Sequence, residues 1–159
     1  MAKSAEFDSV EAAASALKNG ELIIMVDDAS RENEGDLVLA AEKATVEKIN
    51  FMLREARGLI CVPIAPKKAR QLDLPKMTQS KDKFDTPFTV SVDAAAGGTG
   101  ISVKDRLLTI KTILSDDSEP ESLSRPGHVF PLVSRKGGVL QRAGHTEAAT
   151  DLLLVAGMK

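Results

Sequence analysis

The chain has 159 residues, of which 43% are hydrophobic, and a formal net charge of -2 at pH 7. This length supports one hydrophobic core, so we expect a single domain over residues 1–159. The aromatic content of 3%, without Trp or Tyr, and the slightly negative charge argue against a nucleic-acid partner. No stretch approaches the ~20 apolar residues that span a bilayer, and the start lacks a signal peptide's apolar core. We therefore expect a soluble cytoplasmic protein with no membrane partner.

The first part of the chain alternates helical and strand patterns. Apolar residues at helical spacing between an N-cap at Asp8 or Ser9 and a stop at Gly20 predict a first helix. The apolar run 22–26 predicts a buried strand, and 37–41 predicts a second strand. Thr45 is the expected cap of a helix that ends before Gly58, and another strand follows over 58–64.

The second part continues the alternation. Period-two spacing predicts a strand over 87–93, and Ser102 with Asp105 resembles the capping box of a helix over 103–114. The apolar run 129–133 predicts a strand, in which Pro131 indicates an edge position. A final helix is expected over 146–156, while 77–86 and 115–124 are typical of mobile surface loops. The order predicts an α+β fold, a single-domain mixed sheet packed with helices.

Residues 27–36 read DDASRENEGD, which places five carboxylates and one arginine directly after a predicted buried strand. Such a density of negative charge is tolerable only when it is solvated, paired or bridged by a cation. A plain solvated loop is one interpretation. Its position behind a core strand favours the other, in which the loop binds a hard divalent cation or acts as acid and base.

Residues 125–145 read RPGHVFPLVSRKGGVLQRAGH, with four basic side chains, no acid and both histidines of the chain. His128 follows a predicted turn and is either a structural residue or a general acid or base. His145 begins the predicted last helix, where unpaired N–H groups attract phosphate and Arg142 and Thr146 offer further donors. Simple helix capping is the alternative. The acidic and basic segments together suggest a site for a metal and a small phosphate.

Three further features are less specific. Gly97–Gly100 reads GGTG and could bind an oxyanion, but it lacks the P-loop and dinucleotide patterns. Gly137–Gly138 is interpreted as a turn between strands, with Arg135 and Lys136 as surface charges. The single cysteine, Cys61, excludes an internal disulfide and is interpreted first as a small buried hydrophobe of a protein from a reducing compartment.

Several of these strings, in order, resemble the 3,4-dihydroxy-2-butanone 4-phosphate synthases of riboflavin biosynthesis. The strings are RENEGDLVLAAEKAT, RGLICVP, FTVSVDA, RPGHVFPL and GGVLQRAGHTEAATDL, and the resemblance spans about residues 5–157. It implies a lyase that converts ribulose 5-phosphate to 3,4-dihydroxy-2-butanone 4-phosphate and formate. It also implies Mg²⁺ or Mn²⁺ without an organic cofactor, and a homodimer with active sites at the subunit interface.

The resemblance assigns roles by matched motif. Glu32 and His145 would hold the metal, and His128 matches the family's essential histidine. Asp36 and Glu34 are candidate proton-relay carboxylates, and Cys61 matches a cysteine near the site. The residues expected to contact the substrate are Arg31, Glu32, Asp36, Thr99, Arg142, Ala143, Gly144, His145 and Thr146.

The sequence departs from the family pattern in two places. Family members usually have G-V-T-T-G where this chain has the shorter Gly97–Gly100. Family chains also continue past the last helix into a strand with an essential glutamate, which has no match before Lys159. We therefore expect an incomplete copy of a longer chain, which could also carry a GTP cyclohydrolase II domain. The alternative is a non-catalytic sugar-phosphate or metal-binding protein, or a dimerisation partner.

Overall fold

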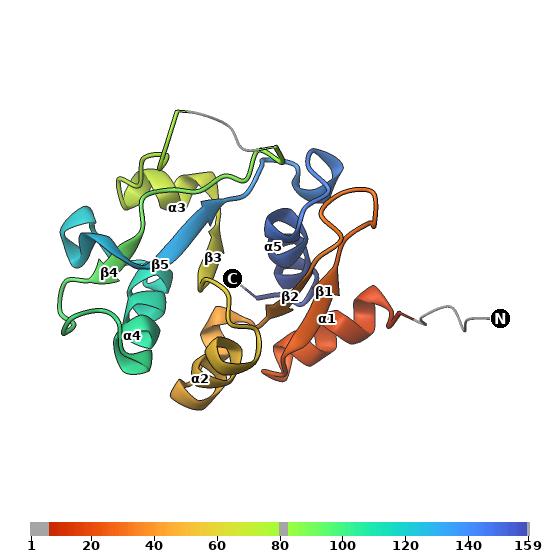
Figure 1. The fold of residues 1–159 in the computed structure, drawn as a ribbon, viewed down its shortest axis with the longest axis horizontal. Coiled ribbons are helices and arrows are strands. Elements are labelled where there is room, and N and C mark those ends of the chain that lie inside the picture. Colours follow the sequence, from red (N-terminus) through yellow and green to blue (C-terminus); the bar gives the residue numbers. More distant parts are fainter. Residues whose placement is uncertain (1–6, 80–82, 159) are drawn as a thin grey trace.

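A computed structural model describes residues 7–79 and 83–158 (Figure 1). Part of the predicted loop 77–86 lies outside these residues. The elements in chain order are α1 (Val10–Lys18), β1 (Ile23–Val26), β2 (Gly35–Val38), η1 (Ala41–Lys43), α2 (Val46–Glu55), β3 (Cys61–Ile64), α3 (Pro66–Gln71), β4 (Val92–Ala94), α4 (Val103–Leu114), η2 (Pro120–Ser122), β5 (Leu123–Val133), η3 (Gly138–Leu140) and α5 (His145–Val155).

Side-chain caps fix the start of three predicted helices. Ser9 accepts a hydrogen bond from the N–H of Ala12 at the start of α1, and Thr45 does the same for α2. Ser102 accepts from the N–H of Asp105, so α4 begins at Val103 as predicted. Each hydroxyl satisfies an N–H group that the first helical turn leaves unpaired. Four predicted helices are thus confirmed, while the short α3, which begins with a proline, was not predicted.

The strands form two sheets. In the mixed sheet the order is β3-β5-β4, with β3 parallel to β5 and β4 antiparallel to it. The β1–β2 hairpin is a separate antiparallel pair, in which Met25 lies opposite Asp36. The α+β class and the mixed sheet are confirmed. The expectation of one sheet is wrong for the described residues, because no ladder there joins the hairpin to β3.

Pro131 lies in the central strand β5, so the prediction of an edge strand is wrong. The N–H groups of Phe130 and Ser134 donate to the carbonyls of Ile60 and Ile64, on the β3 side. Because the direction of backbone N–H groups alternates along a strand, the nitrogen of Pro131 faces the other side. There the ladder is irregular, and the Pro131 carbonyl accepts from the N–H of Thr89. Because proline has no N–H, Pro131 cannot return this hydrogen bond to Thr89, and it is accommodated on the irregular side of the central strand.

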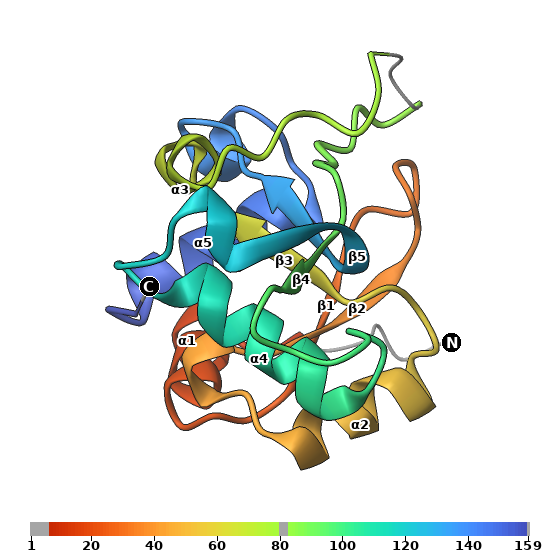
Figure 2. The ribbon, with the colours of Figure 1, turned by 90° about the vertical axis from the view of Figure 1, so that its left-hand side faces the viewer.

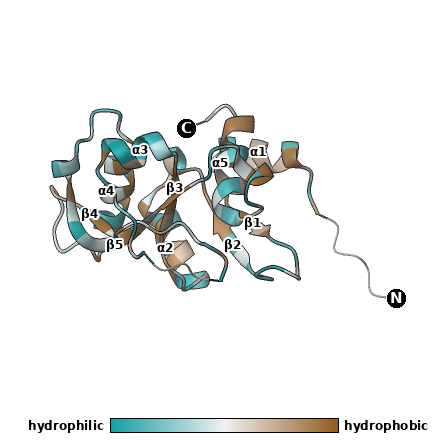
Figure 3. Ribbon diagram, turned by 90° about the horizontal axis from the view of Figure 1, so that it is seen from above, coloured by the Kyte–Doolittle hydropathy of each residue, from teal (hydrophilic) through white to brown (hydrophobic). Residues whose placement is uncertain are grey.

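The strand β1 is half exposed, which corrects the prediction of a buried strand. Ile24 is 72% exposed and Val26 is 49% exposed, while Ile23 and Met25 are partly covered. Figure 3 shows β1 coloured as hydrophobic along its length. The helix α1 packs against β1 and leaves one face of the two-stranded sheet exposed to solvent. The chain therefore exposes an apolar face beside the acidic loop.

Two other predicted segments differ from the structure. The strand expected over 87–93 is regular only at β4, and its earlier part makes isolated bridges such as Phe88 with Leu132. The turn at Gly137–Gly138 leads into η3 and α5 rather than into another strand. Both glycines have positive φ values, of 98° and 60°, which explains why glycine is present there.

The core lies between the mixed sheet and its helices. Leu107, Ile110 and Ile113 of α4 pack with Val92 and Val129 of the sheet, all within 9% exposure. On the other side of the molecule, α5 packs against α1, β3 and η3. Figure 2 shows that the β1–β2 loop extends away from α2 and α4. None of the helices in the described ranges is long and apolar enough to cross a bilayer.

Candidate functional site

Asp27 organises the acidic loop between β1 and β2. One carboxylate oxygen accepts the N–H of Glu34 at 3.0 Å, and the other accepts the N–H of Glu32 at 3.1 Å and Arg31 Nη1 at 2.7 Å. Burial of Asp27 opposes its ionisation, but these hydrogen bonds from Glu34, Arg31 and Glu32 outweigh it and lower the pKa to about 2. The loop is therefore folded around a carboxylate that stays ionised at neutral pH.

Asp27, Glu32 and His145 form a cluster in which one ligand atom of each lies within 4.8 Å of the others. His145 is the first residue of α5, and its Nδ1 lies 3.9 Å from Asp36 Oδ2. Within the part of the chain that the structure describes, His145 Nε2 is the one buried side-chain nitrogen or oxygen without a hydrogen-bond partner. A partnerless imidazole nitrogen beside two carboxylates is a suitable donor set for a divalent cation.

The structure thus brings together Glu32 and His145, which the sequence placed in a metal site, and adds Asp27. Asp27 belongs to the acidic string, but its position as the first residue after β1 was the only signal that separated it from its neighbours. Glu34 and Asp36 are exposed residues of the same loop region. The predicted acidic site is therefore a compact group at one end of the hairpin.

Arg31 supplies the positive charge of this cluster. Its Nη1 lies 2.7 Å from Asp27 Oδ2, its Nη2 lies 2.7 Å from Glu32 Oε1, and its guanidinium carbon lies 5.6 Å from the ring centroid of Phe84. A Cβ on Gly144 would lie 2.9 Å from Arg31 Nη2, so the backbone before α5 approaches the guanidinium closely. The arginine, the start of α5 and the carboxylates are therefore neighbours.

Arg142 has a structural position. Its Nη1 lies 2.8 Å from Glu147 Oε2, and its Nε and Nη2 donate to the carbonyl of Phe84. The Glu147 side chain is 0% exposed and also accepts the N–H of Arg135. The three guanidinium nitrogens of Arg142 each donate one hydrogen bond within the protein, and the predicted phosphate contact of this side chain stays a prediction. Ala143, Gly144 and the buried Thr146 flank His145 in the sequence, and Gly144 is the one of them that closely approaches Arg31.

His128 is placed elsewhere, in the middle of β5. Its Nδ1 lies 2.8 Å from Asp93 Oδ2, and its N–H donates to Asp93 Oδ1 at 2.9 Å. It lines a pocket together with Arg57 and Arg106. Thr99 is exposed in the loop whose Gly100 packs against Asp93. Within one chain, His128 and Thr99 therefore belong to a second group of residues. Asp93 was missed because only the folded sheet brings it to His128.

Cys61 is exposed at the start of β3, so its interpretation as a buried hydrophobe is wrong. Although the residue as a whole is exposed, neighbouring atoms keep water from part of its sulfur, and this desolvation, followed by the charge of Asp36, raises the pKa of the thiol to about 11. The Cys61 thiol is thus protonated at neutral pH and is not an activated thiolate. Its response to Asp36 also shows that these two predicted catalytic residues are near one another.

Alkylation of Cys61 by iodoacetamide is expected to be slow at pH 8 and to rise towards pH 11. The thiolate is the reacting form, and its pKa is raised from the usual 9.0 to about 11. Mass spectrometry of the modified protein, with glutathione as the reference thiol, measures the profile. Asp36→Asn should shift the profile to lower pH. An inflection below pH 9 in the unmodified chain would contradict the assignment.

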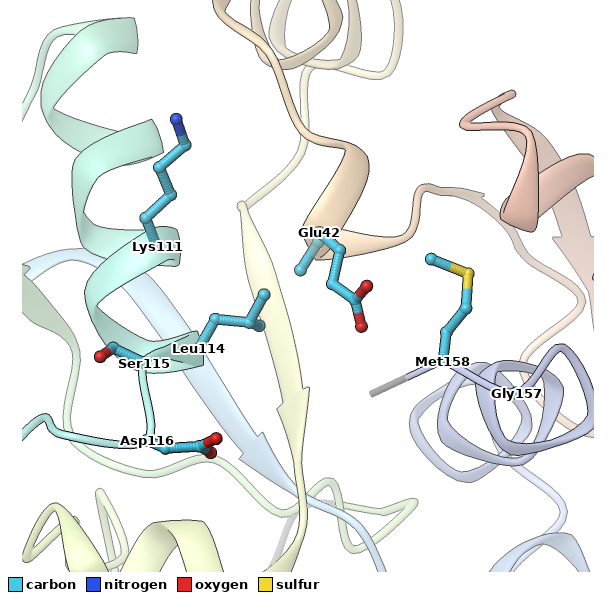
Figure 4. A pocket seen from close by; sticks show the side chains of 8 residues that line it. Glu42, Lys111, Leu114, Ser115, Asp116, Gly157 and Met158 are labelled. Atoms are coloured by element: carbon cyan, nitrogen blue, oxygen red, sulfur yellow. The ribbon is translucent and has the colours of Figure 1, made fainter.

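One surface pocket lies apart from these groups. Figure 4 shows Glu42 of η1, Lys111 and Leu114 of α4, and Met158 near the end of the described chain around it. None of the predicted site residues lines this pocket. The candidate groups therefore lie at the hairpin with the start of α5, and where β4 pairs with β5.

The fold and these groups define an α+β protein with a candidate carboxylate–histidine metal site. Residues 11–159 match the family model of 3,4-dihydroxy-2-butanone 4-phosphate synthase. The chain is 53% identical over 157 residues to the riboflavin biosynthesis protein RibBA of Aquifex aeolicus, and 49% identical over 152 residues to the 3,4-dihydroxy-2-butanone 4-phosphate synthase of Pelobacter propionicus. These alignments cover 96% and 94% of this chain. The chain belongs to the 3,4-dihydroxy-2-butanone 4-phosphate synthase family.

A solved structure agrees with this membership. The crystal structure of a 3,4-dihydroxy-2-butanone 4-phosphate synthase in complex with two magnesium ions matches with a TM-score of 0.92 and 46% identity, over 96% of this chain and 72% of that chain. The chain spans only 39% of the Aquifex aeolicus protein and 65% of the Pelobacter propionicus protein.

Proposed function

We propose that this protein converts ribulose 5-phosphate to 3,4-dihydroxy-2-butanone 4-phosphate and formate. The observation that carries the proposal is the cluster of Asp27, Glu32 and His145 with its buried partnerless Nε2, in a member of this family. A protein that only bound a sugar phosphate would need no acid and base groups. The side chains that could transfer protons are those of His128, Asp36, Glu34 and Cys61. Their presence favours catalysis over binding alone.

We infer that Glu32 and His145 hold Mg²⁺ or Mn²⁺, that Asp27 is a third protein ligand, and that no organic cofactor takes part. The two magnesium ions of a related synthase support a divalent metal. A sparse protein donor set suits Mg²⁺, which keeps several non-protein ligands. When bound, such an ion stabilises negative charge on substrate oxygens. The positive charge of Arg31 and the N–H groups at the start of α5 are placed to bind anionic oxygens of the sugar phosphate.

The other residues handle protons. Formation of an enediol requires a base that removes a carbon-bound proton and an acid that returns it, and His128 is the group suited to both at neutral pH. Asp36, whose side chain is 55% exposed, and Glu34 are candidate relay carboxylates. Cys61 carries its proton at neutral pH, so it would act as a donor rather than as a nucleophile.

We infer a homodimer in which His128 of one subunit lies beside the metal cluster of the other. Within one chain His128 contacts Asp93 and lines a pocket that shares no residue with the cluster. Exposed apolar residues occur near both groups, namely Ile24 and Val26 on the hairpin and Leu59 in the His128 pocket. Burying such surface is a common reason for association. A cytoplasmic location remains part of this proposal.

Release of formate from ribulose 5-phosphate tests the proposed activity. With Mg²⁺ present we expect formate and a four-carbon phosphate in equal amounts, measured by formate dehydrogenase and mass spectrometry. Treatment with EDTA should stop the reaction, and added Mg²⁺ should restore it, because the carboxylates cannot replace the cation's charge. Binding of ribulose 5-phosphate without formate release, using the full-length natural chain, would favour the non-catalytic alternative.

Mixing two inactive variants tests the shared site. Glu32→Gln and His128→Ala subunits each lack one of the two residues that the shared site needs. A mixed dimer nevertheless has one site in which both residues are intact. After unfolding and refolding of an equal mixture, we expect about a quarter of the unmodified activity on statistical grounds. Failure to recover activity, when sedimentation shows that mixed dimers form, would contradict an interface site.

A further inference from the structure

We propose that Asp93 is a positioning residue that fixes the tautomer of the His128 imidazole. We also propose that Gly100, which has no side chain, leaves the space that the Asp93 carboxylate occupies. The claim about the tautomer rests on geometry alone. Its consequence for turnover rests on the proposed function. It also gives the Gly97–Gly100 loop a role other than the binding of an oxyanion.

Asp93 contacts both the backbone and the ring of His128. Oδ1 accepts the N–H of His128 at 2.9 Å, and Oδ2 lies 2.8 Å from Nδ1. A carboxylate offers only acceptors, so the short contact places the ring proton on Nδ1. Nε2 then carries the free lone pair and is the nitrogen that can take a proton.

A bulge in the sheet creates this contact. On β4 the neighbours Val92 and Asp93 pair with Val129 and Ser124 of β5, so the residues 125–128 protrude from the ladder. Asp93 accepts the N–H of His128 at the end of this protruding segment, and Ser91 Oγ accepts the N–H of Gly127 at 3.2 Å. A Cβ on Gly127 would lie 2.0 Å from the backbone carbon of Val92. The bulge is therefore pressed against β4, and it presents His128 at a fixed place.

The Asp93 side chain is also tightly enclosed by its neighbours. Asp93 is 8% exposed, and a Cβ on Gly100 would lie 1.9 Å from its Oδ2. Gly100 also has a φ of +82°, which side-chain-bearing residues rarely adopt. The His128 side chain, in contrast, is 39% exposed and lines the pocket with Arg57 and Arg106. A constrained carboxylate behind an accessible imidazole is the arrangement expected of a positioned acid–base group.

Nuclear magnetic resonance of the ring nitrogens tests the tautomer directly, because the chain has only two histidines. His145→Gln assigns the two rings. In the neutral form of the unmodified protein, we expect the His128 proton on Nδ1. In Asp93→Asn the new amide can donate to Nδ1, so the proton should move to Nε2 and kcat should fall about 10²-fold or more with KM little changed.

Asp105→Asn is the matched control. Its carboxylate accepts the N–H of Gly98 in the same loop but makes no contact with His128, so tautomer and kcat should stay as in the unmodified chain. A proton on Nε2 in the unmodified protein would overturn the proposal, even if Asp93→Asn fails to fold. So would an active Asp93→Asn with an unchanged kcat. An unmodified chain that keeps the Nδ1 proton but releases no formate would contradict the proposed activity and leave the positioning role supported.

Discussion

Replacing Glu32 with glutamine is expected to abolish formate release while leaving the fold intact. Glu32 lies in the cluster with Asp27 and His145, and the change removes a full charge from the proposed metal ligands. Loss of the metal's stabilisation of substrate charge should cost about 4 kcal/mol or more, which is about 10³-fold in rate. Steady-state formate assays and Mg²⁺ titration would measure the loss.

The fold should tolerate this change because the loop already contains an excess of carboxylates. The partly exposed ion pair of Glu32 with Arg31 contributes at most about 1 kcal/mol, and relief of repulsion among the acids offsets it. Asp28→Asn is the control in the same loop, since the exposed Asp28 contacts Ser30 and not the cluster. Normal turnover of Glu32→Gln at ordinary Mg²⁺ would remove Glu32 from the site.

Arg142→Ala is expected to lower the free energy of unfolding by about 3–5 kcal/mol. The reason is that the Glu147 side chain is 0% exposed and would lose its buried ion-pair partner, the Nη1 group at 2.8 Å. The carbonyl of Phe84 would lose its guanidinium donors as well. Urea unfolding followed by circular dichroism measures the change.

Arg135→Ala is the matched control for this prediction. The Arg135 side chain is 49% exposed and pairs with Asp85 at the surface, so its loss should cost no more than about 1 kcal/mol. The N–H of residue 135 would still donate to Glu147. If Arg142→Ala instead kept its stability and only weakened the binding of ribulose 5-phosphate, Arg142 would be a phosphate ligand, as the sequence first suggested.

Local sequence signals predicted the helices well. Ser9, Thr45 and Ser102 each cap a helix at the expected place, because a cap depends on residues three positions apart. Strand neighbours were not predictable in the same way. The central position of Pro131 depends on an irregular partner segment far away in the chain, which no local pattern describes.

In the candidate site, too, the residue types were predictable from the sequence, whereas contacts between residues far apart in the chain were not. The chemistry of the acidic string and of the two histidines indicated a metal site, and the structure places ligand atoms of Glu32 and His145 within 4.8 Å of each other. The partners that hold the site were not predicted, because Asp93 with His128 and Arg142 with Glu147 meet only through the packing of β4 and α5. Arg142 was assigned to phosphate because a basic residue before a helix resembles an anion site, although its actual partner is a buried glutamate.

The central claim is that the cluster at the start of α5 holds the divalent cation. Pulsed electron paramagnetic resonance of bound Mn²⁺ tests it most directly, because the method detects a ligating imidazole nitrogen. We expect a nitrogen coupling from one histidine in the unmodified protein, lost in His145→Gln and kept in His128→Gln, since the buried partnerless nitrogen belongs to His145. A coupling that persists in His145→Gln, or disappears in His128→Gln, would contradict it.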